Sequence, residues 1–219
     1  MKKTLLFGLA LAGAATAPAQ AQVTGTHAGV LLGGVSSVLD GQINAKGFYK
    51  TGFTAGGVLR YRPSRGFALQ PELLYAQEGT GNGLTPGSSS ADYDLRLHYL
   101  TLPIMAKVYI GRLVNVQAGP QVGLLLSAWQ VGRIYTGSNS TVDREVSDTY
   151  ASFNFALCGG IGVDLPFGLL AQARLNYGLA DVNADADEAK FRQHYDFGGL
   201  HTRSFSFSLG YLFAAKREN

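Results

Sequence analysis

The residues best suited to chemistry are four charged side chains that interrupt otherwise apolar or small-residue segments: Arg60, Glu72, Lys107 and Arg174. Where water is excluded, such charges must pair, because a buried ion without a partner is far costlier than a paired one. Glu72 is the expected central acid, with Lys107 and Arg174 as its candidate partners. The set predicts a structural charge network, and a path for protons or ions is the alternative.

A catalytic alternative involves His98, its neighbour Tyr99, and Ser127 at the end of a later apolar segment. A histidine can act as a general base toward a hydroxyl group, as a lipid-modifying membrane enzyme would require. No motif links these residues, and a histidine at a strand end or in a loop needs no catalytic explanation. We therefore predict no catalytic residue and no enzymatic activity.

The segment 180–202 is acidic, with five carboxylates against two basic side chains: Asp181, Asp185, Asp187, Glu188 and Asp196 against Lys190 and Arg192. Carboxylate oxygens suit Ca²⁺, but the ordered spacing and glycine of a known calcium loop are missing. His194 and His201 add only a weak transition-metal possibility. A solvated acidic loop is the better interpretation, and we expect no metal and no cofactor.

The first 21 residues have the features of a secretory signal peptide. Lys2 and Lys3 precede an apolar stretch from Leu5 to Ala17, and Ala19-Gln20-Ala21 is a small-x-small cleavage site. Cleavage after Ala21 would leave residues 22–219 as one domain and lower the formal charge from +3 to +1. The composition of that domain gives no support to a nucleic-acid partner.

Composition and cysteine usage narrow the class further. Only 15% of the residues are charged and 46% are hydrophobic, which excludes an intrinsically disordered chain. Cys158 is the only cysteine, so an intrachain disulfide is impossible, and it is expected to fill space in an apolar, glycine-rich stretch. Beyond the leader no apolar run is long enough for a membrane-spanning helix.

The rest of the chain alternates between apolar and mixed positions with the period of two that is typical of β-strands. Between Tyr99 and Ile110 every even-numbered residue is apolar, while the odd-numbered face includes Lys107. Further polar residues on such mixed faces are Gln117, Gln121, Asp164 and Gln172. This pattern predicts eight strands, over residues 27–33, 51–62, 67–76, 99–110, 114–127, 153–164, 169–177 and 204–213.

The connections between these segments alternate in length. The expected long connections are 34–50, 79–94, 130–149 and 180–202, and the short ones are 63–64, 111–112 and 165–166. Short periplasmic turns and long extracellular loops are typical of transmembrane barrels. The fold class is therefore all-β, an eight-stranded antiparallel up-and-down transmembrane β-barrel with four long extracellular loops.

A soluble lipocalin-like barrel has the same alternation, but its apolar side chains face inward. The membrane sense is favoured because the mixed faces carry mainly glycine and amides, where a soluble surface would be rich in lysine and glutamate. Aromatic residues near strand ends also suit interfacial girdles. These are Phe67, Tyr75, Tyr99, Tyr109, Tyr177, Tyr211 and Phe213. A soluble periplasmic binding barrel is kept as the alternative.

Several blocks resemble the PorT-like outer-membrane β-barrel family of Bacteroidetes. They are Gln70-Pro71-Glu72-Leu73-Leu74-Tyr75, Tyr99-Leu100-Thr101-Leu102-Pro103, residues 113–123, residues 173–179 and residues 208–213. The resemblance implies a small integral barrel in the outer membrane of a Gram-negative cell envelope. A role in secretion or gliding does not transfer, because most members of the family have no assigned role.

The expected function is thus a structural or surface-interaction role without catalysis. The expected partners are outer-membrane lipid and lipopolysaccharide around the barrel, and the barrel-assembly machinery, which reads a terminal aromatic residue of the last strand. That residue would be Phe213, although residues 214–219 follow it. An extracellular or envelope protein partner is also possible, and the sequence does not identify one.

Overall fold

The computed structural model describes residues 24–40, 48–82, 91–136, 138–184, 190, 194 and 199–213. The expected leader, residues 1–21, lies outside the described residues. So do Asp185, Asp187, Glu188, Arg192 and Asp196 of the acidic segment.

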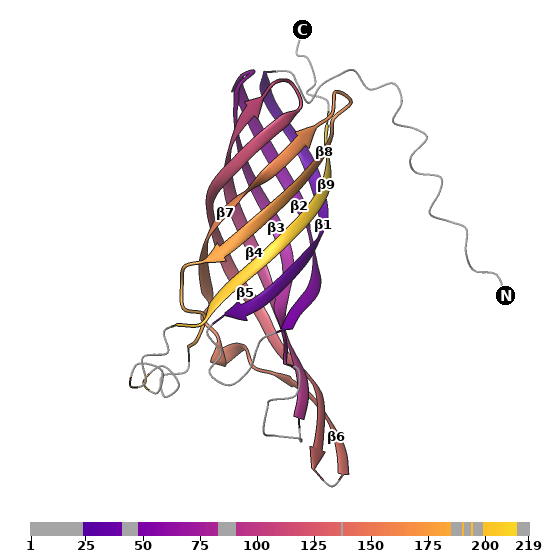
Figure 1. Cartoon of the computed structure of the whole chain (residues 1–219), viewed down its shortest axis with the longest axis vertical. Coiled ribbons are helices and arrows are strands. Elements are labelled where there is room, and N and C mark those ends of the chain that lie inside the picture. The colour runs from indigo at the N-terminus through magenta and orange to yellow at the C-terminus, as the bar shows by residue number, and fades with distance from the viewer. Residues whose placement is uncertain are drawn as a thin grey trace, which may run out of the picture.

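The chain folds into a closed antiparallel β-barrel (Figure 1). Its strands are β1 (Gly25–Asp40), β2 (Phe48–Ser64), β3 (Phe67–Asn82), β4 (Ala91–Ile110), β5 (Val114–Thr136), β6 (Ser138–Glu145), β7 (Phe153–Asp164), β8 (Leu169–Gly178) and β9 (His201–Leu212). Each strand pairs with its neighbour along the chain, except that β7 pairs with β5, and β1 pairs with β9 to close the barrel. Strand β6 pairs only with β5 among the described residues. The predicted eight-stranded barrel is confirmed, and β6 is an addition to it.

The alternation of side chains has the sense that a membrane requires. Along β9, Phe205, Phe207 and Leu209 face outward and are about half exposed, while Ser204 and Ser206 face the lumen and are buried. A protein in water would expose the serines and bury the phenylalanines. The soluble lipocalin-like alternative is therefore wrong, because the apolar face of the sheet points away from the lumen. No helix among the described residues is long and apolar enough to cross a membrane.

Strands at one end of the barrel are longer than the sequence pattern indicates. Parts of the connections expected at 34–50, 79–94 and 130–149 are strand, including the whole of β6. The prediction fails there because a paired strand outside the membrane needs no lipid-facing residues, so its side chains need not alternate. Figure 1 shows β6 and the last part of β5 projecting beyond the barrel.

The opposite end of the barrel has tight turns. Arg65 and Gly66 join β2 to β3, residues 111–113 join β4 to β5, and residues 165–168 join β7 to β8. Gly111 has a φ of 75° and Gly168 a φ of 94°, which are left-handed conformations that glycine adopts without steric cost. This end, called the short-turn end below, also holds the paired start of β1 and end of β9.

Candidate functional site

The candidate site is a network of charged and amide side chains inside the barrel. Arg60 on β2 and Asp164 at the end of β7 form its first ion pair, and each side chain is only 1% exposed. Arg60 Nη1 donates to Asp164 Oδ2 at 2.7 Å, and Nη2 donates to Oδ1 at 3.3 Å. The hydroxyl of Tyr109 on β4 donates to the same carboxylate at 2.6 Å. This pair therefore ties three strands together across the lumen.

The second ion pair joins Glu72 on β3 to Arg174 on β8. Arg174 Nη1 and Nη2 donate to the two carboxylate oxygens of Glu72 at 2.7 and 2.5 Å. The flat guanidinium and the carboxylate thus meet in the two-bonded arrangement that arginine favours. Glu72 is 1% exposed and Arg174 is 5% exposed, so water screens this pair very little.

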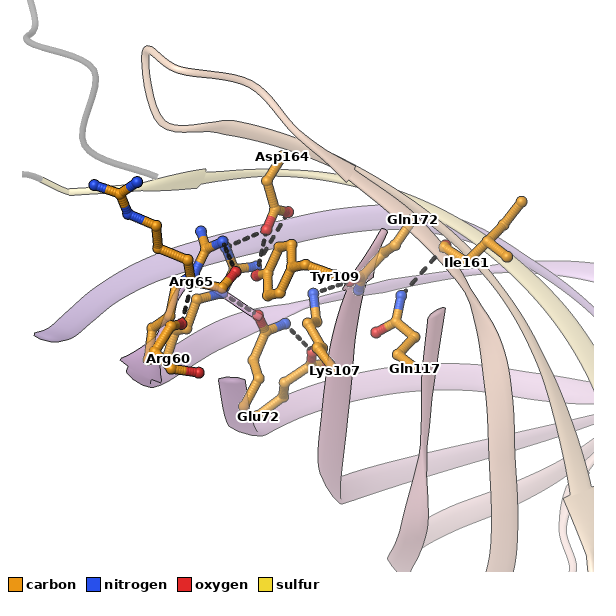
Figure 2. A network of polar contacts seen from close by, with 12 residues as sticks. Arg60, Arg65, Glu72, Lys107, Tyr109, Gln117, Ile161, Asp164 and Gln172 are labelled. Carbon is orange, nitrogen blue, oxygen red and sulfur yellow. Dashed lines mark hydrogen bonds and ion pairs between the residues drawn. The ribbon is translucent and has the colours of Figure 1, made fainter. Parts of the chain in front are cut away.

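Gln70 connects the two pairs. Its side-chain oxygen accepts from Arg60 Nε at 2.7 Å, and its side-chain nitrogen donates to Glu72 Oε1 at 2.5 Å. Figure 2 shows Arg60, Asp164 and Tyr109 joined by dashed contacts, with Glu72 and Lys107 beside them in the lumen. Gln70 lies two residues before Glu72 on the same face of β3, which is why both side chains point into the lumen.

Lys107 is fully buried in this region, but it does not form an ion pair with Glu72. Instead, Lys107 Nζ donates a hydrogen bond to Gln172 Oε1 at 3.5 Å. The same oxygen of Gln172 also accepts from Arg174 Nη2 at 3.0 Å. Of the two candidate partners of Glu72, the structure therefore selects Arg174. The physical reason is that the guanidinium saturates both carboxylate oxygens, which the single ammonium of a lysine cannot do.

The remaining polar residues expected on the mixed faces also lie on the lumen side. Gln117 accepts from Arg174 Nη2 at 3.0 Å and donates to the carbonyl of Ile161 at 3.3 Å. Gln121 is half-buried and lies 3.5 Å from the sulfur of Cys158, which is buried in the wall. These contacts extend the polar network along the barrel axis without adding another charge.

The lumen leaves little free space next to the network. A cavity of about 30 Å³ lies beside Arg174, with Glu78, Thr101 and Gln121 among its lining residues. A buried water needs roughly 10–15 Å³ of such volume, so this cavity has room for only a few waters. Side chains fill a barrel of eight strands, and the observed packing agrees with that expectation.

The lumen at the other end contains an apolar cluster, beside buried polar side chains such as Glu78 and Ser204. Buried side chains from three barrel strands and from the last connection form one cluster: Leu39, Leu95, Leu97, Tyr99, Ala128, Val182 and Leu200. Tyr99 and Tyr109, expected in an outer aromatic girdle, are only 1% and 8% exposed and face the lumen. That expectation is wrong for both residues, because position near a strand end does not indicate on which face a tyrosine lies.

The residues of the catalytic alternative do not assemble as catalysis would need. His98 pairs in register with Ser127, yet the His98 ring hydrogen-bonds through Nδ1 to the hydroxyl of Tyr75. No hydrogen bond joins His98 to Ser127 among the contacts described. Tyr99 lies on the other side of the sheet in the apolar cluster, where its hydroxyl has no hydrogen-bond partner among the described residues.

Asp181 of the acidic segment stabilises the local backbone by accepting two hydrogen bonds. Its Oδ1 accepts from the backbone N–H of Asn183 at 2.9 Å and from that of Leu200 at 3.0 Å. Nδ1 of His201 lies 3.0 Å from the carbonyl of Ala180. Among the described residues, no three His, Cys, Asp or Glu side chains form a group that could hold a metal ion.

Sequence reasoning did not assign Gln70, Tyr109 and Glu78 to the lumen network. The period of two places Gln70 on the face of Glu72 and Tyr109 on the face of Lys107, so the signal was present for both. Glu78 lies beyond the segment expected as strand. It is 6% exposed, and it accepts a hydrogen bond from Ser204 Oγ at 3.2 Å.

No curated protein matches this chain. Among solved structures, the chain is similar to Ail, the attachment invasion locus protein of Yersinia pestis, with 14% identity, a TM-score of 0.47, and 87% of this chain and 100% of that chain covered. It is also similar to Neisserial surface protein A, with 12% identity, a TM-score of 0.46, and 87% and 98% covered. A third is the outer membrane protein OprG from Pseudomonas aeruginosa, with 15% identity, a TM-score of 0.39, and 89% and 99% covered.

The family model described as "Outer membrane protein beta-barrel domain" matches residues 19–183. This match spans most of the chain and includes strands β1 to β8. The outward apolar face and the closed sheet are the features that such a domain needs in a bilayer. The chain belongs to this family of outer-membrane β-barrel proteins.

Proposed function

We propose that the protein is a non-catalytic surface-interaction protein of the outer membrane, anchored by a barrel that conducts no solute. Within this proposal the chain is exported by a signal peptide cleaved after Ala21, and its short turns face the periplasm. We further propose membership of the PorT-like group, on the sequence blocks around Glu72 and Tyr99.

The observation that carries the proposal is the sheet that continues past the barrel. Strand β4 has 20 residues and β5 has 23, whereas a transmembrane strand needs only about 9–11. In this extension β5 pairs with β4 on one side, from Ala91↔Ile134 onward, and with β6 on the other, from Thr136↔Ser138 onward. A sheet built outside the membrane has no anchoring role, so an interaction role accounts for it better.

The outer edge of β6 indicates the kind of partner. Strand β6 pairs only with β5 among the described residues, so one side of its backbone presents unpaired N–H and C=O groups. Extended peptides bind such edges by adding a further strand, with main-chain hydrogen bonds providing affinity. The proposed partner is therefore an extended segment of another envelope or extracellular protein.

The filled lumen supports the absence of transport. Two buried ion pairs block it near the short-turn end, and the apolar cluster around Leu97 and Val182 blocks it at the other end. An ion crossing this path would have to separate buried pairs and then enter an apolar layer, and both steps are costly.

The test is a variant in which Gly132–Val142 is replaced by an Asn-Gly turn between the paired residues Val131 and Asp143, which joins β5 to the end of β6. Parent and variant, each checked for barrel folding by heat-modifiability on a gel, are used to select binders from a library of random displayed peptides. We expect peptides that bind the parent and not the variant. Equal enrichment on both proteins would contradict the interaction role of the extension.

Two further measurements test orientation and catalysis. Protease sites inserted at Ser138–Ser140 should be cut on intact cells, whereas sites inserted next to Arg112 should not. Lipid A from cells with and without the protein should have the same mass spectrum. A modified lipid A that disappears with His98→Ala would replace this proposal with an enzymatic one.

A further inference from the structure

The short-turn end of the barrel has a basic cup, defined here as the hollow lined by Arg62, Arg65, Gly111 and Arg112, with a volume of about 490 Å³. Arg65 and Arg112 come from two different turns and are exposed, while Arg62 near the end of β2 is 2% exposed. Three of the four described lining residues are cations and none is an acid. Field lines from like charges in a concave surface add, which raises the local concentration of anions.

Arg62 is held in place by the protein itself. Its guanidinium carbon lies 3.8 Å from the centroid of the Tyr109 ring, and Nη2 donates to the carbonyl oxygen of Arg65 at 2.7 Å. The nearby carboxylate of Asp164 is already paired with Arg60. One of the three positive charges of the cup is therefore positioned before any ligand arrives, and this lowers the entropic cost of binding.

A second polar group lies one step further into the lumen. Asn115 on β5 is directly opposite Tyr109 and three residues after Arg112, and it is fully buried. Neither atom of its side-chain amide has a hydrogen-bond partner among the described residues. Buried amides almost always have partners, so this unpaired amide marks a polar position next to the cup where a water could bind.

We propose that the basic cup binds a ligand that carries two or more phosphate groups. Arginine forks match phosphate oxygens in paired hydrogen bonds. Three arginines carry more positive charge than a ligand with one carboxylate would neutralise, so a ligand with several negative charges fits the cup better. The volume lies in the range of roughly 300–1,000 Å³ that small-molecule sites occupy. A soluble polyphosphate compound and the head group of a diphosphate lipid share this chemistry. The site goes beyond the proposed function and does not depend on which side of the membrane the short turns face.

The first experiment titrates inorganic pyrophosphate into the folded full-length protein in an uncharged detergent, with calorimetric detection at low and high salt. The main variant is Arg65→Gln/Arg112→Gln, because both side chains are exposed and the fold should tolerate their loss. We expect pyrophosphate to bind the double variant at least about tenfold more weakly than the parent. Arg203→Gln on β9, near the other end of the barrel, is the matched control and should bind like the parent.

The second experiment separates the two sources of the phosphate groups. Parent and double variant are placed in phosphatidylcholine nanodiscs with or without diphosphatidylglycerol, and thermal unfolding is followed. Stabilisation of the parent alone by the diphosphate lipid assigns a head-group site, and pyrophosphate binding without this effect assigns a soluble ligand. The variant Arg62→Lys is tested in the same way after its fold has been checked by heat-modifiability. If it loses pyrophosphate binding or stabilisation by the lipid, the cup is further supported as the binding site. The proposal is overturned if neither probe has an effect that depends on Arg65 and Arg112, or if Arg203→Gln weakens binding as much as the double variant.

Discussion

The two ends of the barrel lumen are filled by different chemistry. Near the short-turn end, two buried ion pairs cross the lumen between residues 104 and 102 positions apart in the sequence. Near the long connections, an apolar cluster of leucines with Tyr99, Ala128 and Val182 fills part of the lumen, and its members Val182 and Leu200 come from the last connection. One end is thus held by directional bonds between strands, and the other by apolar packing of a loop against strands.

The difference follows from what each end has to hold. Ion pairs are favourable in a low-dielectric interior only with fixed geometry, and paired barrel strands provide that geometry at Glu72 and Arg174. A connection that enters the barrel mouth is positioned less strictly. Apolar contacts, which do not depend on orientation, suit it better. We therefore expect the ionic end to respond sharply to single changes in charge and the apolar end to respond to changes in volume.

The largest expected effect is that of Glu72→Ala at the ionic end. The change leaves Arg174 buried without a counter-ion and removes the link from Gln70 to the second pair. Breaking a buried pair by removing one partner typically costs about 3–5 kcal/mol. The midpoint of heat-modifiability in detergent should fall accordingly, and an unchanged midpoint would show that the network does not stabilise the barrel.

A double-mutant cycle sharpens this prediction. Combining Glu72→Ala with Arg174→Met should recover part of the loss, because the second change removes the orphaned charge. Combining it with Lys107→Met should recover less, since Lys107 bonds to Gln172 rather than to Glu72. Equal recovery by both combinations would mean that Lys107 and Arg174 share the carboxylate.

The matching change at the apolar end is Leu97→Ala. Leu97 is fully buried in the cluster with Val182, and truncation leaves a cavity in its place. Such changes cost about 2–5 kcal/mol, and we expect a value near 3 because the last connection can partly collapse into the space. Leu102→Ala on the outer face, 44% exposed, is the control and should matter less in detergent. Identical melting of the two variants would argue against a packed core at this end.

Much of the barrel was predictable because its determinants are local. The period of two fixes which side chains share a face, so Arg60, Glu72 and Lys107 could be assigned to a mixed face without any knowledge of contacts. The partner of Glu72 could not be predicted, since it depends on the register of strands about a hundred residues apart. A single bulge, such as the one between His98 and Tyr99, also shifts the pairing in a way that the sequence does not reveal.

The ends of the barrel were the least predictable part. Outside the bilayer no lipid face constrains the side chains, so the extensions of β4 and β5 and the whole of β6 resembled polar loops. The apolar cluster was missed for a related reason. Val182 and Leu200 lie far apart in a segment that was expected to be a polar loop, and only the folded loop brings them onto Leu97 and Tyr99.

A smaller effect is expected where the last connection enters the barrel. Val182 is fully buried, its N–H donates to the carbonyl of Leu200 at 2.9 Å, and its carbonyl accepts from the N–H of Ala151 at 2.9 Å. Val182→Ala removes about two buried methylene equivalents, which is worth roughly 1–2 kcal/mol. The amide of residue 182 should exchange with deuterium about 5–30-fold faster, while amides in β8 keep their rates. Unchanged exchange at residue 182 would mean that backbone bonds alone hold the loop.

The smallest effect is expected for an ion pair outside the lumen. Arg203 on β9 pairs with Asp40 on β1 at 2.6 Å, and its guanidinium carbon lies 4.6 Å from the centroid of the Tyr177 ring. Both charged side chains are about half exposed, and pairs of this kind contribute at most about 1 kcal/mol. Arg203→Ala should therefore lower the midpoint of heat-modifiability only slightly, and 1 M salt should reduce the difference further. Glu72→Ala should keep most of its effect in the same salt, because water and ions do not reach the buried pair. Equal salt sensitivity of the two variants would show that solvent enters the lumen as far as Arg174. Burial of the ion pairs would then no longer explain why the ionic and the apolar end of the lumen differ.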